Sequence, residues 1–347
     1  MPNKKFKTGN SEIDQRILEL AELFAPSESH EVLRLEMLTT VAKFFLEHND
    51  LGDYKLINTT LKELRHAFRI FHPYRGIRKV VIFGSNRSKT FDPCYKLAYE
   101  LSKIIANEGM MVITGAGGGI MEAANKGASK QNSFGINIKL PCEQKPNPFI
   151  NDDPKLMEFK YFFTRKLIFI KESDATVLLP GGLGTLDEGF ESLTLFQTGK
   201  SLPRPIILLE PKNGTYWNTW MDWVKSVLVK NKFILPNDVH LFQLKHSSKE
   251  AYGAIHDFYR VYHSLHYFKG LTILRFTKPI SKKIIDRLNI EFEDIVVKGK
   301  IYSSPPLQGE VQSHDKTLKM PRLIFKFDKQ SFGRLNQMIQ NINEWVR

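Results

Sequence analysis

The stretch that decides the fold is residues 160–200, KYFFTRKLIFIKESDATVLLPGGLGTLDEGFESLTLFQTGK. Its apolar run from Ala175 to Leu179 predicts a buried strand. A glycine-rich turn follows, from Pro180 to Thr185, and then a helix that opens with Asp187 and Glu188. Glycines let backbone N–H groups approach a ligand, and the first turn of a helix leaves N–H donors unpaired at the positive end of its dipole. This order of elements therefore predicts an anion site.

A carboxylate in the first turn of that helix has two interpretations. Glu188 either caps the helix or does chemistry beside a bound phosphate. The turn is not a Walker loop, because Gly-Lys-Ser/Thr is missing, and it does not fit the G-x-G-x-x-G pattern of dinucleotide-binding folds.

Short apolar runs alternate with helical patterns on both sides of this stretch. The alternation predicts an α/β fold, a doubly wound, Rossmann-like parallel sheet, whose ligands bind at the carboxyl ends of the strands. Glycine-bearing turns follow the strands that end at Phe83, Thr114 and Leu179. The expected strands are 79–83, 111–114, 133–138, 175–179 and 205–209, and the expected helices are 92–107, 120–130, 163–172, 185–197, 216–229 and 248–262.

The alternation of short apolar runs with helical patterns stops at both ends of this region, which predicts that the chain has three parts. Residues 1–75 read as a helical N-terminal module, residues 76–265 as the Rossmann-like domain, and residues 266–347 as a small α+β module. Apolar residues from Ile13 to Phe24 recur on one helical face, and residues 322–327 read as a half-buried strand. Residues 299–320 read as loop with at most one strand. Packing or assembly is the expected role of both flanking modules.

The glycine turn resembles the signature P-G-G-x-G-T-x-x-E of the LOG (Lonely Guy) family, often labelled lysine decarboxylase. The upstream pair Arg165-Lys166 matches an Arg-Lys pair of that family. Further matches are Phe83-Gly84-Ser85-x-Arg87, the run Thr114 to Ala124 with Ala116 where many members carry Gly, and the run Gly135 to Pro141. The resemblance covers roughly residues 76–265.

The resemblance implies hydrolysis of the N-glycosidic bond of a nucleoside 5′-monophosphate, of the AMP or cytokinin riboside type, to free base and ribose 5-phosphate. The transition state is a cation-like sugar, which the carboxylate of Glu188 would stabilise while orienting water; covalent attack by Glu188 stays open. Arg165 would hold Glu188 and the sugar or phosphate with its fork of donors. The family implies no metal or redox cofactor, and a homo-oligomer with the site near the subunit interface.

The remaining site residues implied by the resemblance fall into three groups. Lys166 would add charge, the turn residues would cradle the phosphate, and Glu143 would lie near the base. Simpler interpretations stay open: Arg165 as a surface ion-pair partner, the second glycine turn as close packing, and the first as a plain turn. The expected substrate-binding positions are Lys166, Gly181, Gly182, Gly184, Thr185, Gly84, Ser85, Gly117, Gly118, Glu143 and Thr194.

Composition limits the classes of function. The 347 residues carry a formal net charge of +13, with the Lys and Arg spread along the chain rather than in runs. This spread favours a generally basic surface that attracts anionic nucleotides, with nucleic-acid binding as the alternative. Two cysteines, Cys94 and Cys142, argue against a disulfide framework. The sequence shows no signal peptide and no membrane span, so we expect a cytoplasmic protein.

Three rival functions remain at this point. A non-catalytic nucleotide sensor on the same fold would bind AMP without releasing base. A nucleic-acid-binding protein would show affinity that falls steeply with salt. A literal lysine decarboxylase would need a lysine-bound pyridoxal phosphate, and the sequence offers no context for one.

Overall fold

The computed structural model describes residues 7–24, 30–47, 49–141, 145–307 and 316–346. It divides into two compact units, Met1–Lys62 and Glu63–Arg347. The first unit contains α1 (Ser11–Leu23), α2 (Glu31–Glu47) and the beginning of α3 (Leu51–Phe71). Asn10 caps α1 by accepting hydrogen bonds from the amides of Glu12 and Ile13.

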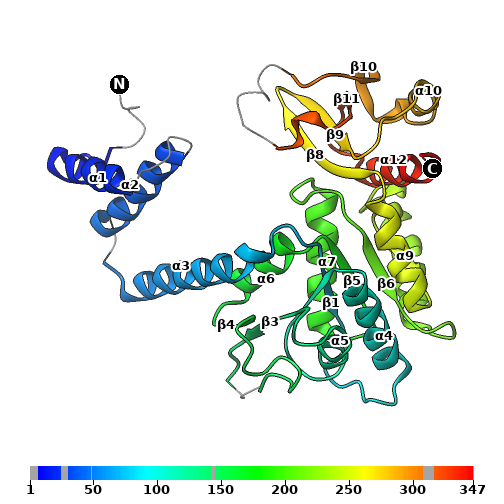
Figure 1. Cartoon of the computed structure of the whole chain (residues 1–347), viewed down its shortest axis with the longest axis horizontal. Helices are drawn as coiled ribbons and strands as arrows, with labels where there is room; N and C mark the ends of the chain where they lie inside the picture. Colours follow the sequence, from blue (N-terminus) through cyan, green and yellow to red (C-terminus); the bar gives the residue numbers. More distant parts are fainter. Residues whose placement is uncertain (1–6, 25–29, 48, 142–144, 308–315, 347) are drawn as a thin grey trace. The chain divides into compact units, whose positions relative to one another are not determined.

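The second unit is built on a parallel sheet of seven strands, in the order β4-β3-β2-β1-β5-β6-β7 (Figure 1). The chain moves outward from β1 through β2 and β3 to β4, then returns to the other side of β1 and continues to β7. This arrangement confirms the doubly wound α/β class. The strands are β1 (Lys79–Phe83), β2 (Met111–Thr114), β3 (Ser133–Ile138), β4 (Leu156–Phe159), β5 (Ala175–Leu178), β6 (Ile206–Leu209) and β7 (Gln243–Lys245).

Both faces of this sheet are covered by helices, which explains its continuous apolar strands. Alternate residues of β1 enter different hydrophobic cores: Val80 and Ile82 pack with one helix layer, Val81 and Phe83 with the other. The first layer contains α4 (Pro93–Asn107), α5 (Ile120–Ala128) and α9 (Ser248–Phe258). The second contains α6 (Phe162–Glu172), α7 (Leu183–Gln197) and α8 (Tyr216–Trp223).

A smaller antiparallel sheet follows α9, in the order β10-β11-β9-β8 (Figure 1). Its strands are β8 (Tyr262–Phe268), β9 (Leu271–Phe276), β10 (Val296–Ser303) and β11 (Arg322–Phe327). The helices α10 (Lys282–Glu291) and α12 (Phe332–Trp345) pack against it, and the apolar face of α12 joins the same core as α7. The C-terminal module is therefore continuous with the parallel-sheet domain.

Several local predictions were wrong. The helix expected over 248–262 ends at Phe258, and Tyr262 already begins β8, whose aromatic and β-forming residues favour a strand. The helix expected over 216–229 is α-helical only to Trp223 and continues as a π-helix, Val224–Val229. The edge strands β4 and β7 were not expected, because four and three residues give almost no periodic signal.

The strand β10 lies partly in residues expected to be loop. Gly299, at φ +80°, and irregular register against β11 break its alternation, so the strand is hard to recognise from sequence. In the parts of the chain that the structure describes, no helix combines the length and apolarity needed to cross a membrane.

Candidate functional site

The candidate site lies where the order of the parallel strands reverses. The chain leaves β1 toward β2 on one side and returns as β5 on the other, so the turns after these two strands open a crevice between them. Gly84 and Ser85 follow β1, and the turn Gly181 to Thr185 follows β5. The turn after β2, expected to join the site, lies beside them.

Backbone hydrogen bonds join these three turns. The Ser85 amide donates to the carbonyl of Pro180 over 3.1 Å, which ties the first turn to the third. The Ser85 carbonyl accepts from the Ile120 amide over 3.0 Å, which ties the first turn to the start of α5. Gly119 adopts φ +64°, and a side chain there would collide with the Ser85 carbonyl, so this approach requires glycine.

The turns surround a cavity of about 610 Å³. Its walls combine backbone from the glycine turns, two acids, two arginines and several apolar side chains. The lining residues are Phe83, Gly84, Ser85, Asn86, Arg87, Gly115, Met121, Ile138, Leu140, Phe162, Arg165, Phe169, Gly182, Leu183, Gly184, Thr185, Asp187 and Glu188. The structure therefore brings together Arg165, Glu188 and five of the expected phosphate-side positions.

Glu188 is buried in the wall of this cavity, with 6% of its surface exposed. Its Oε2 lies 3.2 Å from Nζ of Lys166. The same ammonium group also contacts Asp187 and Glu191, each at 2.8 Å. Lys166 does not line the cavity itself, so it acts behind Glu188 and connects the first turn of α6 to the first two turns of α7.

Opposing forces set the pKa of Glu188. Burial raises the pKa of this carboxyl, and the positive charges of Lys166 and Arg165 pull it back down without cancelling the effect. Burial also lowers the pKa of Lys166, but the hydrogen bonds that Lys166 donates to Asp187 and Glu191, with the charges of Glu188 and Glu191, outweigh burial and raise it. Lys166 therefore stays charged, and Glu188 is a carboxylate that is costly to ionise and is held by cations.

Arg165 enters the cavity from the first turn of α6. Its Nε donates to the carbonyl of Ile136 over 2.8 Å, and its guanidinium lies over the ring of Phe169. Burial lowers the pKa of Arg165 to about 10, opposed by Glu188, so the group remains a cation at neutral pH. A side chain at Gly115 would collide with Nη2 of Arg165, so the glycine leaves room for the guanidinium.

The start of α7 is the place where the sequence predicts an anion cradle. Gly182 and Gly184 are exposed, and a Cβ at either would meet open space, so these two glycines face the cavity opening rather than packed protein. The amides of Thr185 and Leu186 both donate to the Gly182 carbonyl. The amides of Leu183 and Gly184 precede them and occupy the first helical positions, where α-helices lack intrahelical acceptors.

Other expected residues lie outside the cavity wall. Gly181 packs on Thr185, and its carbonyl accepts a hydrogen bond from the Tyr216 hydroxyl over 2.6 Å. Lys166 stands behind Glu188, as described above. Thr194 lines a separate small cavity between α7 and α8. Glu143 lies outside the described residues.

The second glycine turn also stands back from the cavity, apart from Gly115. Asn147 donates to the carbonyls of Ala116 and Gly117 and so fixes their orientation. Ala116 has φ +62°, a left-handed conformation that explains why many family members carry glycine at this position. Gly117 and Gly118 therefore shape the turn in this structure rather than line the crevice.

Sequence reasoning did not select several residues of the site. Asn86 and Arg87 line the cavity beside Ser85, while Phe162 and Leu183 form its apolar rim. Glu191 shares Lys166 with Glu188. The spacing of Glu191, one turn after Glu188 on the same helix, is the signal that could have identified it.

Comparisons with known proteins agree with this arrangement. The family model described as "Possible lysine decarboxylase" matches residues 121–255, which include β3, β5 and the glycine turn. An uncharacterised protein of Archaeoglobus fulgidus is 30% identical over 115 residues, 33% of this chain and 74% of the relative. A cytokinin riboside 5′-monophosphate phosphoribohydrolase of Arabidopsis thaliana is 34% identical over 94 residues, 27% of this chain and 42% of the relative. The enzyme of the same name from Mycobacterium tuberculosis is 30% identical over 129 residues, 36% of this chain and 66% of the relative.

Solved structures align with about half of the chain. The molybdenum cofactor binding protein of Rippkaea orientalis is 22% identical, with 51% of this chain and 93% of that chain covered and a TM-score of 0.36. The molybdenum cofactor carrier protein of Chlamydomonas reinhardtii is 19% identical, with 52% and 96% covered and a TM-score of 0.35.

Proposed function

The chain belongs to the LOG family, and from this premise we propose that it hydrolyses the N-glycosidic bond of a nucleoside 5′-monophosphate, of the AMP or cytokinin riboside monophosphate type. The products would be the free base and ribose 5-phosphate. The relatives of named activity are phosphoribohydrolases.

The observation that carries this proposal is the placement of one buried carboxylate beside an anion cradle. Glu188 lies in the same cavity wall as Gly182 and Gly184, within the first two turns of α7. The helix start favours a phosphate, while the carboxylate repels one. A ligand that satisfies both must be negative at one end and develop positive charge at the other. A ribose 5-phosphate unit undergoing cleavage at C1′ has this charge distribution.

In the proposed mechanism, separate groups bind the phosphate, stabilise the charge on the sugar and position the carboxylate. The exposed amides at the start of α7 bind the 5′-phosphate, and the Thr185 side chain closes the cradle. The Glu188 carboxylate faces the sugar, stabilises the positive charge that develops at C1′ and accepts a proton from the attacking water. Arg165 keeps Glu188 ionised and orients it, and Lys166 holds the same carboxylate from behind.

The direct test is to incubate the protein with AMP and to measure the released adenine by chromatography. The Glu188→Gln variant should lose about 10²–10⁴-fold in kcat, because it keeps the shape of the side chain and removes its charge. Glu191→Gln is a matched control: it removes a second carboxylate from the same lysine, but Glu191 does not line the cavity. Equal losses in the two variants would remove Glu188 from the chemistry. Tight AMP binding by the wild-type protein without any release of base would instead make the protein a nucleotide sensor.

We also propose that the protein works as a homo-oligomer, because α6 and α7, the helices that carry Arg165 and Glu188, expose several apolar side chains. On α6, Phe162, Phe163 and Leu167 are each about half exposed. On α7, Leu183 is 85% exposed and Phe190 is 41% exposed. Exposed apolar groups so close together favour contact with another protein surface.

A second copy of the chain is the partner that this proposal names for that surface. Light scattering on the purified protein should give a mass that is a multiple of the 40.1 kDa chain. Phe163→Glu should shift the mass toward the monomer, and Phe91→Glu, at an exposed aromatic residue on neither helix, should not. A monomeric wild-type protein would overturn the oligomer proposal and leave the hydrolase proposal standing.

A further inference from the structure

A second cavity lies at the opposite, amino-terminal end of the parallel sheet. Its volume is about 420 Å³, within the roughly 300–1,000 Å³ of small-molecule sites. One wall comes from residues that precede β1, β5 and β6, and the other from the start of β8 in the antiparallel sheet. The lining residues are Arg78, Leu167, Ile170, Lys171, Ser173, Asp174, Lys200, Ser201, Leu202, Pro203, Arg204, Tyr259, Tyr262, His263 and Ser264.

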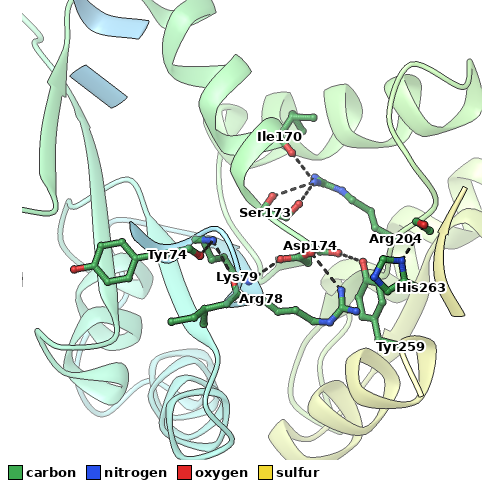
Figure 2. A network of polar contacts seen from close by, with 11 residues as sticks. Tyr74, Arg78, Lys79, Ile170, Ser173, Asp174, Arg204, Tyr259 and His263 are labelled. Carbon is green, nitrogen blue, oxygen red and sulfur yellow. Dashed lines mark hydrogen bonds and ion pairs between the residues drawn. The ribbon is translucent and has the colours of Figure 1, made fainter. Parts of the chain in front are cut away.

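The charged groups of this wall are mostly cations. Arg78, Lys171, Lys200 and Arg204 face a single carboxylate, that of Asp174. Asp174 is already engaged: it accepts from the Lys79 amide over 2.8 Å and pairs with Arg78 at 3.4 Å (Figure 2). Lys171 pairs with Glu172 outside the cavity wall. Two cations, Arg204 and Lys200, have no ion pair with a carboxylate among the described residues.

Arg204 is the more unusual of these two cations. Only 5% of its surface is exposed, yet its hydrogen-bond partners are all neutral. It donates to the carbonyls of Ile170 and Ser173, each at 2.9 Å, and to the Ser173 hydroxyl (Figure 2). It also donates to the Thr176 hydroxyl. Its Nε lacks a hydrogen-bond partner in the described part of the chain. A buried charge of this kind is costly unless an anion compensates it.

Two further polar groups without a hydrogen-bond partner among the described residues belong to the same wall. The hydroxyls of Tyr262, which is 1% exposed, and of Ser201 have no hydrogen-bond partner within the described residues. The nearby Tyr259 hydroxyl is committed, since it donates to the Asp174 carbonyl over 2.6 Å (Figure 2). The unsatisfied side-chain groups of this wall, Arg204 Nε and these two hydroxyls, can all donate a hydrogen bond, and none of them is a carboxylate.

We propose that this cavity binds a small phosphorylated anion, at a site separate from the one at the carboxyl end of the sheet. The exposed Lys200 supplies a charge that can contact the ion, and Arg204 adds a buried charge behind the wall. The unpaired Tyr262 and Ser201 hydroxyls lie buried in the same wall. The site joins two domains, because Arg204 precedes β6 while Tyr262 begins β8. A ligand there bridges the parallel sheet and the antiparallel sheet, and its binding does not depend on the reaction proposed above.

The test uses calorimetry of the full chain with inorganic pyrophosphate at fixed ionic strength. Lys200→Glu should weaken binding by about tenfold or more, because it replaces an exposed cation of the wall with an anion. Lys103→Glu makes the same charge change at an exposed position of α4 that lines neither cavity, and should leave the affinity unchanged. Equal affinity in Lys200→Glu and wild type, or no binding at millimolar pyrophosphate, overturns the proposal.

A second measurement separates the two cavities. Thr185→Val alters the phosphate cradle at the other end of the sheet and should leave pyrophosphate affinity unchanged; if binding is lost instead, the ion occupies that cradle and the proposal fails. The imidazole resonances of His263, assigned with a His263→Gln variant, should shift on addition of pyrophosphate, because His263 lines the proposed site. Unshifted resonances in a protein that binds pyrophosphate would place the ion elsewhere.

Discussion

At the carboxyl end of the parallel sheet, Arg165 lies beside a buried carboxylate and donates one hydrogen bond to a backbone carbonyl. At the amino end, Arg204 donates four hydrogen bonds, all to neutral oxygens, and has no carboxylate in contact within the described residues. Arg204 is buried and Arg165 is partly buried. The helix α6 connects them: Arg165 lies in its first turn, and Arg204 binds the carbonyls at its end.

The comparison distinguishes an arginine that supports the fold from an arginine that serves the candidate site. At the end of α6, Arg204 satisfies carbonyls that the helix leaves unpaired, at the negative end of the helix dipole, so its bonds support the fold. Arg165 makes few bonds to the fold and lies near a carboxyl whose pKa burial has raised. Perturbed carboxyls in a cavity are typical of chemistry rather than of stability. Four predictions test this contrast, beginning with the largest expected effect.

Arg165→Gln should abolish most activity and leave the fold intact. We expect kcat/KM for AMP to fall about 10²–10³-fold, the usual effect of removing one group that stabilises transition-state charge. The free energy of unfolding should change by about 1.5 kcal/mol, because a single hydrogen bond from a charged donor to a backbone carbonyl is lost. Base release and urea denaturation measure the two quantities. A variant that loses several kcal/mol of stability with normal turnover would reverse the roles assigned to the two arginines.

Arg204→Gln, in contrast, should lower the stability of the fold strongly. Its guanidinium holds four oxygens at the end of α6, and glutamine reaches fewer of them. We expect the free energy of unfolding to fall by about 3 kcal/mol, typical of losing hydrogen bonds to a charged group and leaving buried acceptors unsatisfied. The midpoint of a urea titration measures this loss. A midpoint as high as that of Arg165→Gln would show that Arg204 adds little to the fold.

The sequence predicted the carboxyl end of the sheet far better than the amino end. The glycine turn, Arg165 and Glu188 lie within one short segment, and the resemblance of that segment to the LOG family related them. Arg204 and Tyr262 are separated by two strands and several helices, and no periodic pattern connects them. Only the packing of β8 against the parallel-sheet domain brings the two residues to one cavity.

The antiparallel sheet shows the same limit. Its strand β11 is continuous and apolar and was predicted, whereas β8 was assigned to the preceding helix. In β8 most residues after Tyr262 are only partly buried, with Leu265 as the buried exception, so the alternation that marks a strand is weak. The ion contacts of Lys166 were also beyond prediction, because its three carboxylates lie on a different helix.

Lys166→Met should move the pH dependence of the reaction. The charge of Lys166 lowers the pKa of Glu188, so its removal raises that pKa further. Glu188 must be ionised to act, and the acid limb of kcat/KM should therefore move to higher pH, by about one unit. Lys171→Met, on the same helix but at the amino end of the sheet, should leave the limb unchanged. If the acid limb of kcat/KM does not move in Lys166→Met, a group other than Glu188 controls that limb.

Tyr216→Phe should have the smallest effect on activity of the four variants. The effect should be confined to the site at the carboxyl end of the parallel sheet. Burial raises the pKa of the Tyr216 phenol, so it stays protonated and donates to the Gly181 carbonyl. Losing this bond should cost about 1 kcal/mol and loosen the turn that holds the phosphate. KM for AMP should rise a few-fold while kcat is nearly unchanged, because the carboxylate of Glu188 is not touched. Tyr252→Phe removes a partly buried phenol of α9 that is bonded to Glu108, and it should leave both constants unchanged. A fall in kcat at constant KM would place Tyr216 in the chemical step and extend the reacting part of the site beyond the first turns of α6 and α7.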